Sequence, residues 1–104
     1  MNRALMHEDL ARAAKLFHAA SNVSRLKLLT HLVAHESNVT NLARLTQLPL
    51  STVSQQLQLL RSVGCVRSRR VGKELRYSIG SGHVRTLLEV GVSLARSNHS
   101  NLPP

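Results

Sequence analysis

The chain has 104 residues, enough for one small domain and too few for two. Lys and Arg number 14 against five acidic residues, so the formal charge is +9 with the six His residues neutral. No apolar run approaches the roughly 18 residues of a membrane span, and the acids near the N-terminus argue against a secretory signal peptide. The surplus of positive charge instead favours a polyanionic partner.

A first helix is predicted over about residues 7–20, because apolar residues recur there at helical spacing. These residues are Leu10, Ala13, Ala14 and Phe17. Asn22 follows, and we expect its side chain to cap a second helix that begins near Val23. The apolar side of that second helix consists of Leu26, Leu29, Leu32 and Val33.

Two further helices with a tight connection come next. The third is predicted over Val39–Thr46, and its apolar residues are Leu42, Ala43 and Leu45. Pro49 marks the connection, because proline lacks the backbone N–H that a helix interior needs. The fourth helix is predicted to run to about Val63 and to end at Gly64. Its inward stripe is Val53, Leu57 and Leu60.

The outer face of the fourth helix is polar. Gln makes bidentate hydrogen bonds to adenine, and Ser or Thr bonds either bases or phosphates. We therefore interpret residues 39–63 as a helix-turn-helix whose second helix reads a DNA groove. The alternative is a face that is merely solvated. The candidate groove-reading residues are Ser51, Thr52, Ser54, Gln55, Gln56 and Gln58.

After Gly64 the apolar period changes from 3.6 to 2, which predicts a β-hairpin over about residues 65–79 with Gly72 in its turn. Its apolar members are Val66, Leu75, Tyr77 and Ile79. Residues 61–85 hold seven Lys and Arg residues against one acid, a net +6 of the chain's +9. Such a bias suits a hairpin that contacts phosphates or the minor groove. The candidate contacts are Arg67, Arg69, Arg70, Lys73 and Arg76.

A last helix is predicted over about residues 83–97, and the polar tail after it is expected to fray. This helix and the one over residues 7–20 carry more apolar surface than one small monomer needs, so we expect them to build a homodimer. The residues concerned are Leu10, Phe17, Leu87, Leu88, Gly91 and Leu94.

The predicted elements make a single α+β domain that is mainly helical. In chain order it has four helices, a small two-stranded β-hairpin and a final helix. A helix-turn-helix followed by a basic hairpin is a winged helix-turn-helix.

The same residues resemble the ArsR/SmtB family of bacterial winged-helix repressors over roughly residues 10–95. The family pattern reads Leu-Ala, then Ser-x-Val-Ser-x-His-Leu, then Leu-Arg, followed by Gly-Leu-Val and the hairpin. The segments that carry the likeness are Ala19–Leu29, Val39–Ala43, Ser51–Leu57, Leu60–Arg61, Gly64–Val66 and Tyr77–Ser78. The resemblance implies a homodimeric repressor that binds an operator in double-stranded DNA.

Three positions depart from the family pattern. Gln56 stands where His is common. Pro49 and Leu50 replace a capping Ser, so the fourth helix is expected to start late. Cys65 replaces an apolar residue, and we expect a small core residue, with a redox sensor as the alternative. As the single cysteine it forms no internal disulfide, which suits a cytoplasmic location.

Many members of the family sense metals, but the family's metal sites are incomplete in this sequence. The third helix has no Cys, and Ser81 replaces the Asp that precedes His83 in the other kind of site. A reduced site stays open, in which His83 of one subunit meets His99 of the other and His7 joins them. Imidazole and oxygen ligands favour Ni²⁺ or Zn²⁺. The alternative is that His83 is only a helix-start residue and that His99 lies in a mobile tail.

Several function classes therefore remain. The first is a transcriptional repressor, metal-responsive or controlled by another ligand. The second is a DNA-binding or architectural protein without an effector, or one controlled by a partner protein. A protein-interaction module is disfavoured by the clustered Arg residues of the hairpin. An enzyme is not expected, because the sequence shows no paired carboxylates, Ser-His-Asp set or phosphate-binding loop.

Overall fold

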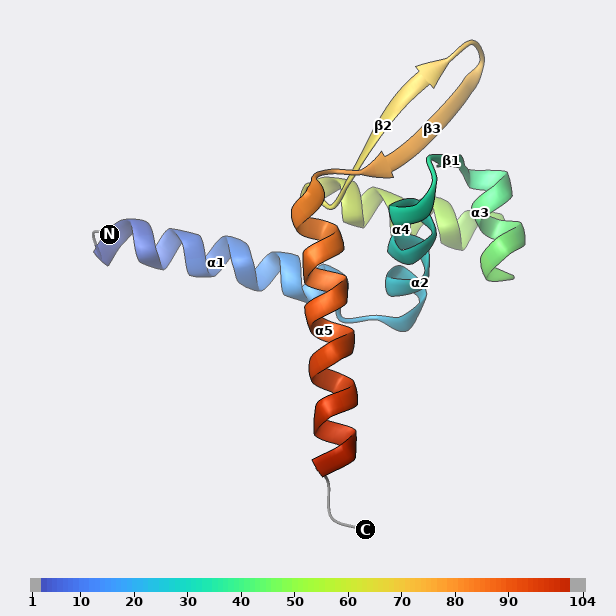
Figure 1. The fold of residues 1–104 in the computed structure, drawn as a ribbon. Helices are drawn as coiled ribbons and strands as arrows, with labels where there is room; N and C mark the ends of the chain where they lie inside the picture. Colours follow the sequence, from blue (N-terminus) through green and yellow to red (C-terminus); the bar gives the residue numbers. More distant parts are fainter. Residues whose placement is uncertain (1–2, 102–104) are drawn as a thin grey trace.

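The computed structural model describes the backbone of residues 3–101 and the side chains of residues 6–98. The expected mainly helical winged fold is confirmed (Figure 1). Its elements are α1 (Arg3–Ala20), α2 (Val23–Ala34), β1 (Ser37–Asn38), α3 (Val39–Thr46), α4 (Leu50–Ser62), β2 (Val66–Val71), β3 (Glu74–Ile79) and α5 (Gly82–Asn101).

One strand and several boundaries differ from the sequence prediction. β1 was not predicted, because a two-residue strand has no apolar period and exists only through its pairing with β3. Both α1 and α5 are longer than expected. The sequence predicts fraying after residue 97, but α5 continues to Asn101, so this prediction is wrong over residues 98–101. No proline or glycine stops the helix where its apolar residues end.

Local capping explains where the middle helices begin. The Asn22 side chain accepts a hydrogen bond from the Arg25 backbone N–H at 3.1 Å, as predicted. The Asn38 side chain does the same for the Asn41 N–H at 2.7 Å and starts α3. α4 begins at Leu50, directly after Pro49, so the expected late start is wrong. Pro at this position already has a φ of −58° and pre-forms the turn.

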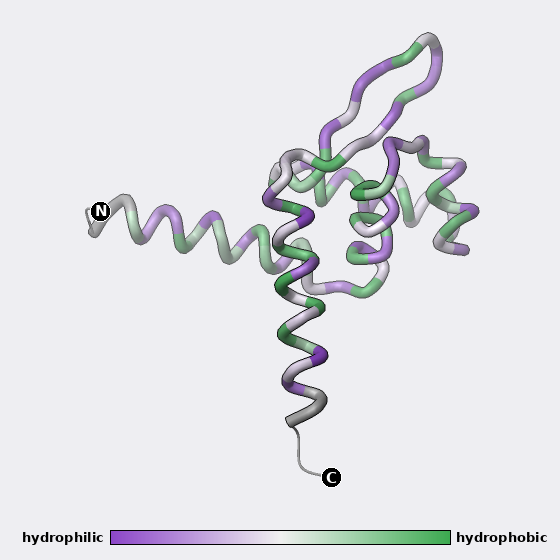
Figure 2. The backbone as a smooth tube through the Cα atoms, viewed as in Figure 1, coloured by the Kyte–Doolittle hydropathy of each residue, from purple (hydrophilic) through white to green (hydrophobic). Residues whose placement is uncertain are grey.

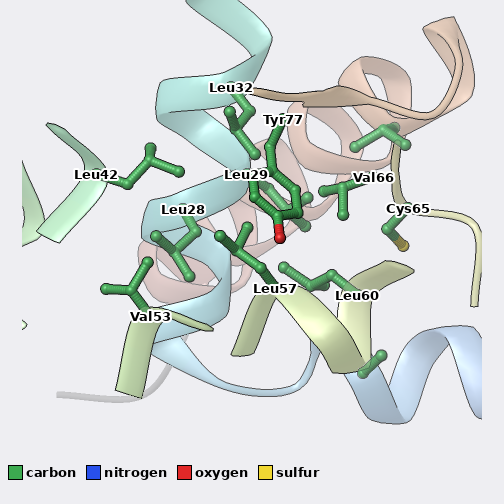
Figure 3. Close-up of a cluster of buried hydrophobic side chains, with 12 residues drawn as sticks. Leu28, Leu29, Leu32, Leu42, Val53, Leu57, Leu60, Cys65, Val66 and Tyr77 are labelled. Atoms are coloured by element: carbon green, nitrogen blue, oxygen red, sulfur yellow. The ribbon is translucent and has the colours of Figure 1, made fainter. Parts of the chain in front are cut away.

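The core lies where α2, α3, α4 and the base of the hairpin meet (Figure 3). The predicted inward stripe of α4 is confirmed, since its three members are fully buried. Leu26, which the sequence places on the apolar side of α2, is 37% exposed, whereas Leu28 is fully buried. Leu45, one of the apolar residues of α3, is 42% exposed. Consecutive leucines at positions 28 and 29 make the inward face of α2 ambiguous from sequence alone.

The sheet is antiparallel, with strand order β1-β3-β2. Its inner face carries the buried residues Val66 and Tyr77, and its outer face carries Arg67, Arg69 and Arg76. Gly72 has a φ of +63°, as the predicted hairpin turn requires. The β2–β3 hairpin, hereafter the wing, extends from the domain body as a free ribbon (Figure 1).

α1 and α5 project from the body in different directions (Figure 1). The radius of gyration is 15.6 Å, whereas a compact domain of this length has about 13 Å. Hydrophobic residues recur along both projecting helices (Figure 2). Among the described residues, no helix has the length and apolar character needed to span a bilayer.

Candidate nucleic-acid interface

The buried face of α4 fixes which of its polar residues point outward. Three of the six candidate groove-reading residues are exposed and three are half-buried. The exposed ones are Ser51, Gln55 and Gln58, and the half-buried ones are Thr52, Ser54 and Gln56. The exposed set recurs at positions i, i+4 and i+7, so it forms one polar stripe opposite the core.

Gln56 differs from its neighbours, because its side chain is engaged by the protein itself. The Arg25 Nη1 atom donates to Gln56 Oε1 at 2.7 Å. The residues are 31 positions apart in the sequence, so no local pattern could have revealed this contact. The structure therefore separates Gln56 from the exposed stripe with which the sequence grouped it.

The wing places most of its predicted cations in solvent. Arg67, Arg69, Arg70 and Lys73 are exposed, and Arg76 is half-buried. The side chains of Arg67, Arg70 and Lys73 make no hydrogen bond or ion pair to any residue that the structure describes. These three cations are available to phosphates.

The other two wing cations are paired with acids on the outer face of the sheet. Arg69 donates to both carboxylate oxygens of Glu36, at 2.7 and 2.8 Å. Arg76 donates to Glu74 at 2.8 Å and lies 3.9 Å from Glu36. Their positive charge is partly offset within the protein, which sets them apart from the three unpaired cations.

The environment of both acids stabilises their ionised form. Arg69 lowers the pKa of Glu36 through its hydrogen bonds and its charge. The pKa of Glu74 is also lowered, first by the hydrogen bond from Asn38 and then by Arg76. Both carboxylates are therefore charged at neutral pH and can hold the guanidinium groups.

Asn38 connects the wing to the helix-turn-helix. Its side-chain oxygen caps α3, and its amide nitrogen donates to Glu74 of β3. In β1, Asn38 also pairs in register with Arg76. The sequence analysis did not single out Asn38, Glu36 or Arg25. A helix-capping pattern in the sequence could have identified Asn38. The hydrogen bonds from Arg25 to Gln56 and from Arg69 to Glu36 join residues more than 30 positions apart, so no local pattern reveals them. Arg25 also makes shorter-range hydrogen bonds to the end of α1.

Of the candidate metal ligands, the structure describes the side chains of His83 and His7. His83 is exposed at the start of α5, and His7 is exposed on α1. The side chain of His99 lies outside the described residues. No group of three or more potential ligands occurs among the side chains that the structure describes.

Cys65 is a core residue, as expected. It is 1% exposed, and burial raises the pKa of its thiol. A protonated, buried thiol is a poor nucleophile, so its position argues against the redox-sensor alternative.

Both projecting helices expose large apolar side chains. On α1 these are Met6, Leu10 and Phe17, and on α5 they are Val90, Val92 and Leu94, all between 48% and 60% exposed. An apolar groove of about 370 Å³ lies between α5 and the helices α1 and α2, and Phe17, Leu87 and Leu88 help to line it. Apolar surface of this extent is typical of an interface with another protein chain.

Comparison with known proteins gives relatives of one kind. No protein-family model matches the chain. It is 40% identical over 80 residues to the transcriptional repressor SmtB homolog of Synechocystis sp., a match that covers 77% of the chain and 61% of that protein. It is 35% identical over 92 residues to the transcriptional regulator NmtR of Mycobacterium tuberculosis, covering 88% of the chain and 77% of the relative.

A solved structure agrees with these relatives. The homodimeric winged helix-turn-helix DNA-binding domain Mb0332 of Mycobacterium bovis, described as a possible ArsR-family transcriptional regulator, superposes with a TM-score of 0.85 at 29% identity. The superposition covers 95% of the chain and 92% of that domain. These proteins are transcriptional regulators rather than enzymes, in agreement with the sequence prediction. The chain belongs to the ArsR/SmtB family of winged helix-turn-helix transcriptional regulators.

Proposed function

We propose that the protein is a homodimeric, sequence-specific DNA-binding regulator that acts as a repressor. The observation that carries the proposal is the exposed polar stripe of α4 in a domain whose wing presents three unpaired cations. The stripe supplies the hydrogen bonds that read base edges, and the wing cations supply sequence-independent attraction to phosphates. The groove-reading role of Ser51, Gln55 and Gln58 and the phosphate role of Arg67, Arg70 and Lys73 are part of the proposal.

A second copy of this chain is the partner that fits the apolar surfaces of α1 and α5. Pairing would cover the exposed residues of both helices and fill the groove beside Phe17. The homodimeric state of the Mb0332 domain supports this choice. A dimer presents two α4 helices, which read half-sites about one helical turn apart or a small multiple of it.

Footprinting of DNA from upstream of the protein's own gene tests the proposal. We expect two protected half-sites related by symmetry, and we expect random DNA of equal length to bind much more weakly. Protection without symmetry would contradict the dimer. Equal affinity for random DNA would contradict sequence-specific regulation and favour an architectural protein. A transcription assay with the same DNA gives the sign, and repression is the expected result.

We also propose that a metal ion controls DNA binding. Its ligands would be His83 of one subunit and His99 of the other, with His7 from α1. What supports it is the exposure of His83 and His7, which leaves both imidazoles accessible. Ni²⁺ or Zn²⁺ suits such ligands. In the proposed site the metal bridges the two subunits, because His83 and His99 are 16 residues apart on α5, roughly 24 Å along one helix. Metal titration of the wild type and of His83→Ala tests this. Binding that the substitution does not change would refute it.

The alternative is a DNA-binding protein with no metal effector, or one controlled by a partner protein. The incomplete family metal sites in the sequence, with no Cys in α3 and Ser81 in place of an Asp before His83, favour this second candidate. It predicts operator binding that is equally tight with a chelator, with Ni²⁺ and with Zn²⁺. A change of about tenfold or more with either metal would contradict it.

A further inference from the structure

Gln56 is a member of the predicted groove-reading set, but its side chain turns toward the protein body. Its Oε1 atom accepts a hydrogen bond of 2.7 Å from Arg25. It is half-buried, whereas Gln55 and Gln58 on the same helix are exposed. The guanidinium occupies one of the two lone pairs of this carbonyl oxygen and holds the amide toward the protein body, which disfavours a bidentate pairing with adenine.

Arg25 joins three elements through one guanidinium group. It lies in the first turn of α2, where the Asn22 cap holds its backbone N–H. Its Nε atom donates to the carbonyl of Ala19, and its Nη2 atom donates to the carbonyl of His18 at 3.3 Å. These carbonyls belong to the last turn of α1, where a positive charge is favourable. The His18 carbonyl also accepts hydrogen bonds from the Ser21 backbone N–H at 3.2 Å and from the Ser21 hydroxyl at 2.7 Å. The remaining Nη1 atom reaches Gln56 in the middle of α4.

We propose that Gln56 is a positioning residue, which acts through Arg25 to fix the orientation of α4 relative to α1. This inference rests on the proposed function, because α4 is the groove-reading helix and α1 is one of the dimer-forming helices. In a dimer, the distance between the two α4 helices depends on the orientation of each α4 relative to the dimer-forming helices of its own subunit. The link between Arg25 and Gln56 then sets how well the two helices match two half-sites.

Two substitutions that add the same negative charge at adjacent positions test the inference. Gln56→Glu keeps an acceptor for Arg25 and turns the hydrogen bond into an ion pair. Gln55→Glu places the same carboxylate on the exposed stripe that faces phosphates and bases. We expect Gln56→Glu to bind the upstream DNA within about threefold of the wild type and Gln55→Glu to bind at least about tenfold more weakly. Gln56→Ala, which removes the acceptor, should also bind about tenfold more weakly.

A Gln56→Glu protein that binds as weakly as Gln55→Glu would overturn the inference, because it would place residue 56 against the DNA. A base preference altered by Gln56→Ala at one operator position would overturn it as well. Unfolding in urea gives a readout without DNA, and Gln56→Glu should be more stable than Gln56→Ala. If the wild type shows no preference for upstream DNA, the proposed function fails. In that case, the free energies of unfolding of Gln56→Glu and Gln56→Ala still decide whether the Arg25–Gln56 link exists.

Discussion

At the residue scale, the wing cations fall into two groups that the sequence cannot distinguish. Arg70 is unpaired among the described residues, whereas Arg69 forms two hydrogen bonds to Glu36. Arg70→Ala should weaken binding to all DNA and lower the slope of log affinity against log salt by about 0.9. Arg69→Ala should lower that slope less, because Glu36 already offsets its charge. Salt titrations of both variants by fluorescence anisotropy check this. A larger change for Arg69→Ala would contradict the pairing.

Gly80 offers a second prediction at this scale. A Cβ atom at this position would lie 2.0 Å from the backbone oxygen of Gly64, where β3 leaves the sheet. Gly80→Ala should therefore lower the free energy of unfolding by about 1–3 kcal/mol, the range for overpacked sites. Gly82→Ala is the matched control, because its Cβ meets nothing within 4 Å. Urea unfolding measures the free energy of unfolding of both variants. Equal values for Gly80→Ala and Gly82→Ala would contradict the prediction, because they would mean that the backbone at Gly64 moves away from residue 80 at little cost.

At the element scale, Glu36 and Asn38 hold the wing to the segment between α2 and α3, through Arg69 and Glu74 respectively. Because the folded state lowers the pKa of Glu36 and Glu74, it binds fewer protons than the unfolded state at mildly acidic pH. Their contribution to stability is present above the ordinary glutamate pKa of about 4.3 and is lost as the pH falls through the lower folded values.

The corresponding measurement is the free energy of unfolding between pH 6 and pH 3. Glu36→Gln should lose less stability over this range than the wild type, because its side chain no longer titrates. Glu89→Gln on the exposed side of α5 is the control and should follow the wild type. Parallel curves for Glu36→Gln and the wild type would mean that the ion pair to Arg69 does not contribute in solution.

The elements were predicted well where a local period or cap determines them. The stripe of Val53, Leu57 and Leu60, the Asn22 cap and the Gly72 turn are all confirmed. β1 could not be predicted, because its only signal is pairing with a strand about 40 residues later. For the same reason the sequence grouped Gln56 with the exposed stripe and did not reveal the partners of Arg69. Burial and long-range hydrogen bonds depend on the assembled fold.

At the scale of the whole molecule, the exposed apolar residues of the projecting α1 and α5 predict self-association. Leu94 on α5 is 58% exposed in the single chain. Leu94→Glu should weaken self-association at least about thirtyfold, because a carboxylate would be buried in an apolar interface. Val71→Glu, at an exposed apolar position of the wing, is the matched control and should leave association unchanged. Sedimentation equilibrium measures both. A Leu94→Glu protein that associates like the wild type would contradict the proposed interface.

The central claim is that the exposed stripe of α4 reads DNA sequence while the wing supplies general affinity. Its most direct test compares the affinity of the wild type and of Gln55→Ala for upstream DNA and for random DNA at the same salt concentration. We predict that Gln55→Ala loses about 1–3 kcal/mol of binding to upstream DNA and almost none to random DNA. An equal loss on both DNAs would contradict the claim, because it would make Gln55 a phosphate contact like the wing cations.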